Sequence, residues 1–144
     1  MKATRWAERL PNLRFIHLTR LDALGQAISH VRALQTWQWV AKAPARAEPV
    51  YDFNRIDSEM RRLLGAQARW AYWLARNGAP TLHLTYEQFI QAPRATVEAV
   101  GRFMGVEALR FDPNEPTVTI QRDALNEEWR ARYLAQARDL GRFD

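Results

Sequence analysis

The 144-residue sequence fits one domain, and its 47% hydrophobic content supports a folded core and excludes a disordered chain. It has no cysteine, which excludes disulfides and thiolate metal sites, and no apolar run approaches the roughly 18 residues that span a bilayer. The net charge of +5 comes mainly from arginine, whose planar fork suits phosphate and sulfate. Because no signal-peptide pattern opens the chain, we expect a cytoplasmic protein. Without cysteine and with only three scattered histidines, we expect no metal centre.

The first predicted elements are a short helix over Lys2–Leu10, ended by Pro11, and a buried strand over Leu13–Thr19. Arg20 follows the strand directly, and Asp22 has the side chain of a helix N-cap. The helix that begins there has an apolar stripe at three- and four-residue spacing, made of Leu24, Ala27, Ile28, Val31 and Leu34. The pattern predicts a strand, a tight turn and a helix.

A loop rich in alanine and proline is predicted over Ala41–Pro49, where it would be exposed and free to act as a lid. A second helix follows from about Asn54 to Arg76, and Asn77 and Gly78 end it. Its buried side is expected to include Ile56, Met60, Leu63, Leu64, Trp70, Ala71, Trp73 and Leu74.

The last third of the chain is predicted to hold a strand over Thr81–Thr85 and a helix over Pro93–Met104. A brief extended segment at Thr117–Ile120 and a helix from about Ala124 to Leu140 follow. Alternating strands and helices indicate an α/β fold with a few parallel strands flanked by helices. Two strands make a poor sheet, so we expect the domain to be partial.

One group of side chains fits an anion. Arg20 lies where ligands bind in open α/β sheets, beyond the carboxyl end of a strand. The next helix offers Gln26, Ser29 and Arg32 away from its apolar stripe, so an amide, a hydroxyl and guanidinium groups would converge on one anionic group. The alternative is that Arg20 pairs with Asp22 or a helix end and that Ser29 is merely exposed.

Other polar and aromatic residues favour structural roles. The three histidines, His17, His30 and His83, lack metal-ligand spacing, and the two in strands are expected in the core. Glu87, beside Tyr86 and ahead of a helix, is expected to make local hydrogen bonds. Five aromatic residues could stack on a sugar or adenine but are more typical of a core or interface: Trp37, Trp39, Trp70, Tyr72 and Trp73.

Three segments carry a family resemblance. Leu13–Thr36, LRFIHLTRLDALGQAISHVRALQT, resembles the strand, turn and helix that bind the 3′-phosphate in sulfotransferases of the bacterial trehalose 2-sulfotransferase type. Leu84–Val106, LTYEQFIQAPRATVEAVGRFMGV, is similar to that family's strand, Tyr-Glu pair and proline-started helix. Gln121–Tyr133 is similar to its carboxy-terminal segment that closes over the nucleotide. The resemblance implies that Arg20 and Ser29 hold the 3′-phosphate of the nucleotide. It also makes Arg122 a candidate for binding the nucleotide.

By this resemblance, residues 1–144 form a single partial domain, the carboxy-terminal part of a sulfotransferase with the fold of P-loop nucleotide hydrolases. The implied reaction moves a sulfuryl group from 3′-phosphoadenosine 5′-phosphosulfate to a hydroxyl of a carbohydrate such as trehalose or of a glycolipid. No glycine-rich stretch precedes a helix, so we expect the 5′-phosphosulfate loop to be absent. The resemblance implies that the general base is absent too, since in this family it normally lies in the same portion of the chain. The isolated chain is then expected to be inactive, without a catalytic residue of its own, and a homodimer is possible.

Two further functions remain open. In the first, the chain is a non-catalytic module that binds a nucleotide or a partner and oligomerises through its open strand edges. Alternatively, its arginines and interleaved aromatics would bind nucleic acid, although no helix-turn-helix or RNA-binding pattern is present, so no nucleic-acid partner is expected.

Overall fold

The structure, a computed structural model, describes residues 10, 12–39, 43–106, 109, 111–112 and 124–141. The chain divides into two compact units, the first made of Met1–Leu21 and Gln67–Pro113, the second of Asp22–Ala66 and Asn114–Asp144. The helix predicted at the start of the chain and the extended segment predicted over 117–120 lie outside the described residues.

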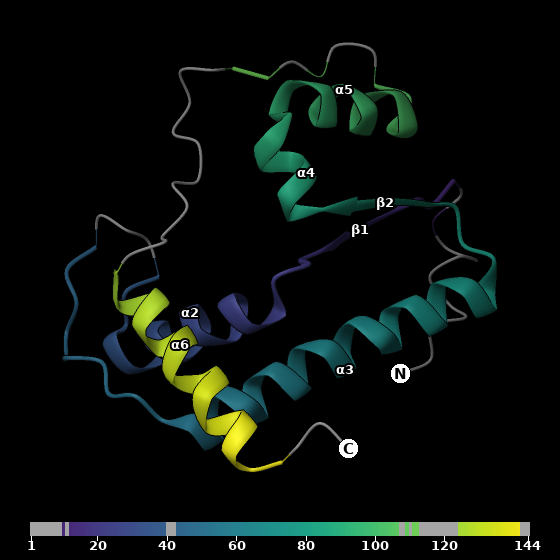
Figure 1. Cartoon of the computed structure of the whole chain (residues 1–144). Helices are drawn as coiled ribbons and strands as arrows, with labels where there is room; N and C mark the ends of the chain where they lie inside the picture. The colour runs from purple at the N-terminus through teal and green to yellow at the C-terminus, as the bar shows by residue number, and fades with distance from the viewer. Residues whose placement is uncertain are drawn as a thin grey trace. The chain divides into compact units, whose positions relative to one another are not determined.

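The first unit contains a parallel pair of strands, β1 (Phe15–Thr19) and β2 (Thr81–Thr85). Phe15 pairs with Thr81 and Thr19 with Thr85, so the two carboxyl ends lie side by side (Figure 1). This pairing confirms the mixed α/β class with a small parallel sheet. It also means that Arg20 and Tyr86, which follow the two strands, lie at the same end of the sheet.

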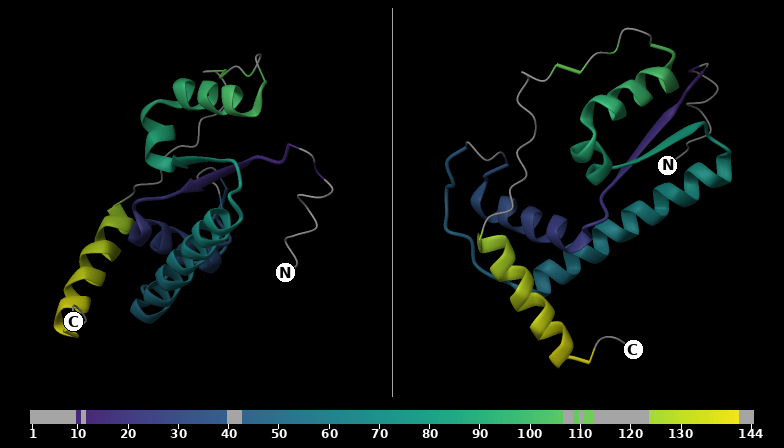
Figure 2. Two further views of the ribbon diagram at one scale, coloured as in Figure 1. Left: turned by 90° about the vertical axis from the view of Figure 1, so that its right-hand side faces the viewer. Right: turned by 45° about the horizontal axis from the view of Figure 1, so that its top comes forward.

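Two helices follow β2 directly, as Figure 2 shows: α4 (Tyr86–Gln91) and α5 (Pro93–Met104). Sequence reasoning predicted α5 but missed α4, which is only six residues long. The hydroxyl of Thr85 accepts from the backbone N–H of Gln88 at 3.1 Å, while the Gln88 side chain accepts from the N–H of Thr85 at 2.9 Å. This reciprocal cap starts the helix at the end of the strand.

The two faces of β1 differ in burial. On one face, the ring of Phe15 packs edge-on against Trp73 of α3 (Phe53–Asn77), with centroids 5.3 Å apart. On the other face, Ile16 and Leu18 are 44% and 57% exposed. The prediction of a buried strand is therefore wrong for one face, because alternate side chains of a strand point to opposite sides and the described residues cover one side only.

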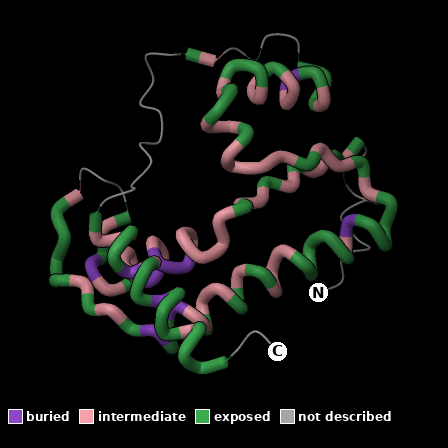
Figure 3. The backbone as a smooth tube through the Cα atoms, viewed as in Figure 1, coloured by how far each residue is buried: buried purple, intermediate pink, exposed green. Residues whose placement is uncertain are grey.

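The second unit has a continuous hydrophobic core built by α2 (Ala23–Thr36), the first part of α3, and α6 (Ala124–Asp139). Figure 3 shows the buried positions gathered on these three helices. The core residues are Ala27, Ile28, Val31, Phe53, Ile56, Trp129 and Tyr133. Ala27, Ile28 and Val31 of the predicted apolar stripe are fully buried as expected, whereas Leu34, at the end of the stripe, is 40% exposed.

Four of the five aromatic residues expected in a core or interface are exposed. Trp37 is 63% exposed, Trp39 54%, Trp70 50% and Tyr72 66%. They do not belong to the core, because each lies on an outward helix face or in the loop after α2. None of the described helices is long and apolar enough to cross a membrane. Within the described ranges, no three His, Cys, Asp or Glu side chains gather as metal ligands would.

Candidate anion site at the end of the first strand

The guanidinium of Arg20 lies over an aromatic ring at the carboxyl end of β1. It lies 4.6 Å from the centroid of the Tyr86 ring, which faces it from the start of α4. Its Nε is buried and has no hydrogen-bond partner among the described residues. A buried donor without an acceptor is rare and costs about 1–3 kcal/mol if it stays unpaired. The side chain is therefore held by an aromatic contact while a donor remains available for an acceptor that the described chain does not supply.

The turn after Arg20 is fixed from α4. Oε2 of Glu87 accepts a hydrogen bond from the backbone N–H of Leu21 at 3.1 Å, across 66 residues of sequence. Glu87 was expected to make local hydrogen bonds, but this bond is long-range, because the parallel register brings the start of α4 beside the end of β1. Tyr86 and Glu87 together orient the backbone and side chain at the carboxyl end of the strand.

Ser29 belongs to α2, in the second unit. It lines a small hollow together with Arg32, whose Nη1 donates to Oδ1 of Asn126 at 2.7 Å. The contact ties the predicted polar side of α2 to the first turn of α6. Gln26, which was expected on the same polar side, has a buried Oε1 without a partner in the described chain; that atom accepts and so suits a donor group.

The predicted site residues belong to different units of the chain. It brings Ser29 and Arg32 to one hollow of the second unit, while Arg20 lies in the first unit. Arg122 lies outside the described residues. The carboxylate considered as a partner of Arg20, that of Asp22, is bound by Arg130 of α6.

Asp22 is the N-cap that the sequence predicted, and it has a second role. Its Oδ1 accepts from the N–H of Gly25 at 2.9 Å, and its two oxygens lie 2.7 and 2.5 Å from Nη2 of Arg130. This charge-assisted contact raises the pKa of Arg130. A Cβ at position 25 would touch the Asp22 carboxylate and lie 2.6 Å from Nη2 of Arg130, so a larger residue there would displace the two side chains of the ion pair.

The three histidines lie outside the hydrophobic core, and each contacts a polar side chain. His17 and His83 face each other across the strand pair, with Nδ1 atoms 3.4 Å apart, and are not buried. The prediction that both are core histidines is therefore wrong. In the second unit, Nδ1 of His30 lies 2.7 Å from Oε1 of Glu59. The two groups form an ion pair when His30 is protonated.

Three supporting residues were not predicted from the sequence: Tyr86 under Arg20, Asn126 on Arg32 and Arg130 on Asp22. The Tyr-Glu pair was visible at the strand end, and its position after the second strand of a parallel pair could have placed it beside Arg20. Asn126 and Arg130 are about a hundred residues from their partners, and no local pattern indicates such contacts.

Comparison with known proteins identifies the family of the chain. The family model described as Stf0 sulphotransferase matches residues 2–136, and the chain belongs to that family. The chain is 30% identical over 132 residues to a trehalose 2-sulfotransferase of Mycobacterium tuberculosis, covering 88% of this chain and 48% of that protein. It is also 30% identical over 133 residues to a trehalose 2-sulfotransferase of Mycolicibacterium smegmatis, covering 88% of this chain and 47% of that protein. The chain thus spans about half the length of these curated relatives. No solved structure matches it.

Proposed function

We propose that this chain supplies part of the nucleotide site of a sulfotransferase, which transfers a sulfuryl group from 3′-phosphoadenosine 5′-phosphosulfate to a carbohydrate hydroxyl. The observation that carries the proposal is the buried Nε of Arg20, which has no hydrogen-bond partner among the described residues and lies at the carboxyl end of a parallel strand in a member of this family. The names of both relatives support trehalose as the acceptor.

The proposed roles are anchoring ones. Arg20 and Ser29 bind the 3′-phosphate, a group remote from the reacting sulfur, and Arg122 contacts the nucleotide from the segment that closes over it. In the reaction, the acceptor oxygen attacks sulfur, the bond from sulfur to the bridging phosphate oxygen breaks, and the hydroxyl proton passes to a base. We assign that base to none of the described residues. Binding energy at the 3′-phosphate serves to place the donor, so loss of an anchor weakens binding and misplaces the sulfur.

Calorimetric titration of adenosine 3′,5′-bisphosphate into the purified chain tests the proposal, with 5′-AMP as the ligand that lacks the 3′-phosphate. We expect weak binding that requires the 3′-phosphate and falls about ten-fold or more in Arg20→Ala, because one charged hydrogen bond contributes about 1.5–3 kcal/mol. Arg20→Lys retains the charge but loses the planar fork and should bind at an intermediate level.

Arg76→Ala is the matched control, since Arg76 is an exposed arginine of the same unit at the end of α3. Equal binding of both nucleotides, or equal loss in both alanine variants, would contradict the assignment of Arg20. No binding by a well-folded chain would instead favour a non-catalytic module whose partner is not this nucleotide.

A further inference from the structure

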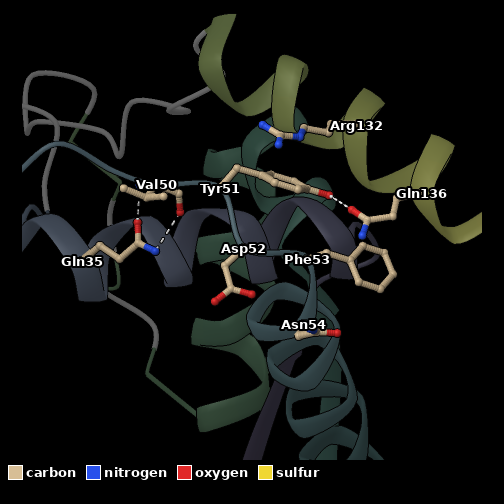
Figure 4. A pocket seen from close by; sticks show the side chains of 8 residues that line it. All are labelled: Gln35, Val50, Tyr51, Asp52, Phe53, Asn54, Arg132 and Gln136. Atoms are coloured by element: carbon tan, nitrogen blue, oxygen red, sulfur yellow. Dashed lines mark hydrogen bonds between the residues drawn. The ribbon is translucent and has the colours of Figure 1, made fainter.

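A second polar hollow lies in the second unit, apart from the residues assigned to the nucleotide. Its volume is about 400 Å³, within the range of small-molecule sites. Figure 4 shows the residues that line it: Gln35, Val50, Tyr51, Asp52, Phe53, Asn54, Arg132 and Gln136. They come from the end of α2, the segment before α3, the start of α3, and α6, and all belong to the same unit.

Hydrogen bonds within the chain shape the walls of this hollow. The Gln35 side chain donates to the carbonyl of Val50 and accepts from its N–H, both at 2.9 Å (Figure 4). Oδ1 of Asp52 accepts from the N–H of Arg55 at 3.0 Å and caps the start of α3. The walls are therefore formed before a ligand binds, which lowers the entropic cost of binding.

One side chain that lines the hollow is a cation. The guanidinium of Arg132 lies 4.1 Å from the centroid of the Tyr51 ring, and in the described part of the chain it forms no ion pair. Burial raises the pKa of Tyr51 despite the nearby Arg132, so the phenol stays protonated and can donate to Oε1 of Gln136 at 3.2 Å. Arg132 and the amide of Gln136 thus offer donors to a ligand.

The same hollow contains an acceptor of opposite charge. Asp52 uses Oδ1 for the helix cap, and its carboxylate lines the hollow. A sulfate or phosphate would gain from Arg132 but would also approach that carboxylate, which repels it. A sugar hydroxyl both donates and accepts, so neighbouring hydroxyls can satisfy Asp52 and Arg132 together. The mixture of one cation, one carboxylate and amides fits a neutral polyhydroxyl ligand better than an anion.

We propose that this hollow binds the hydroxyl-rich acceptor through Arg132, Asp52 and Gln136. The identity of the ligand as a sugar acceptor rests on the proposed function. Gln35 follows Ser29 by six residues on α2, a rise of about 9 Å along one helix axis. One rigid helix therefore carries both the proposed phosphate anchor and a wall of the sugar site, and it fixes their spacing.

Titration of trehalose into the isotope-labelled full chain, followed by amide and indole NMR signals, tests this inference. We expect saturable shifts centred on Gln35, Tyr51 and the indole of Trp129, whose ring lies edge-on to Tyr51 at 5.7 Å. Arg132→Gln removes the charge and keeps a polar side chain, and it should weaken binding about ten-fold. Arg138→Gln, an exposed arginine of the same helix outside the hollow, should leave binding unchanged.

Shifts that lie elsewhere, or that survive unchanged in Arg132→Gln, would overturn the inference. Tighter binding of sodium sulfate than of trehalose at the same residues would also overturn it, because the hollow would then be an anion site. Adenosine 3′,5′-bisphosphate is titrated into the same samples. Nucleotide binding without trehalose binding refutes only the sugar site, whereas trehalose binding without nucleotide binding supports the hollow and refutes the nucleotide proposal.

Discussion

Asp22 joins two interactions whose contributions can be separated at the residue scale. It caps α2 through the N–H of Gly25, and it pairs with Arg130, with side chains 27% and 30% exposed respectively. Asparagine is an equally good cap but carries no charge, so it removes the ion pair alone.

We expect Asp22→Asn to cost up to about 1 kcal/mol of unfolding free energy, as half-exposed ion pairs do. Asp22→Ala should cost about 1 kcal/mol more, because the cap is lost as well. Urea unfolding of the three proteins at pH 7 measures both steps. Equal losses in the two variants would mean that the cap contributes nothing.

Glu59 should make stability depend on pH. Its pKa lies below the ordinary value, first because Arg62 donates a hydrogen bond to it and also because His30 is near. The folded state therefore binds the Glu59 proton less readily than the unfolded state. The stabilisation is present above the ordinary glutamate pKa of about 4.3 and is lost as pH falls through the lowered folded-state pKa.

Urea unfolding between pH 3 and 6 checks this expectation, with Glu59→Gln as the comparison. The wild-type chain should lose stability toward pH 3 more steeply than the variant, by roughly 1 kcal/mol or less, since Arg62 is exposed. Parallel curves for the two proteins would show that the lowered pKa has no effect on folding.

Contacts within one helix turn could be predicted from the sequence, as the N-cap formed by Asp22 shows. Contacts between residues far apart in the sequence could not be predicted. The sequence placed Arg20 at a strand end but could not show the Tyr86 ring beside its guanidinium or the Glu87 carboxylate on the next N–H. Those contacts depend on the register of two strands, which no local pattern specifies.

At the scale of elements, α6 is held to the second unit mainly by Trp129 and Tyr133. Trp129 is 2% exposed and Tyr133 stacks on Phe53 at 4.8 Å. Tyr133 also donates to Oδ1 of Asp57 at 2.8 Å. The same helix carries Asn126, Arg130 and Arg132. The packing of α6 therefore positions these side chains for their contacts with α2 and with the segment before α3.

Trp129→Ala should therefore destabilise the second unit by about 3–5 kcal/mol, the cost of truncating a buried tryptophan. Leu134→Ala, on the same helix but 40% exposed, should cost about 1 kcal/mol or less. Thermal and urea unfolding followed by circular dichroism compares them. Similar losses in the two variants would show that α6 is not anchored through its buried tryptophan.

The long helices were predictable because their apolar spacing persists over many turns, and the observed bounds of α3 and α5 agree with it. The short α4 was missed, although Thr85 and Gln88 form the pattern of a capping box and could have revealed it. The exposed aromatics of α3 were misjudged because tryptophan and tyrosine content does not specify which helix face is covered.

At the scale of the whole molecule, burial is uneven between the two units. In the described residues of the first unit, only Leu74 and Gly101 are buried, whereas the second unit has a core of seven buried residues. Regions with few buried apolar contacts open at lower free energy. The sheet of the first unit should therefore exchange its amide hydrogens sooner than the helices of the second.

Hydrogen exchange followed by mass spectrometry tests this expectation on peptides that cover Phe15–Thr19, Thr81–Thr85 and the core helix α2. We expect protection of α2 to outlast that of both strands. Strands that exchange as slowly as α2 would show that the two units unfold as one cooperative body.

The parallel register of β1 with β2 also determines the order of events as the chain folds. Partners such as His17 and His83 are 66 residues apart, and α2 and α3 lie between them. Closing so long a segment is entropically costly and slow relative to forming helices. During synthesis, β1 therefore stays unpaired until β2 has been made, and Ile16 and Leu18 can then pair with other chains. For the same reason, the refolding yield of the purified protein should fall as the protein concentration rises.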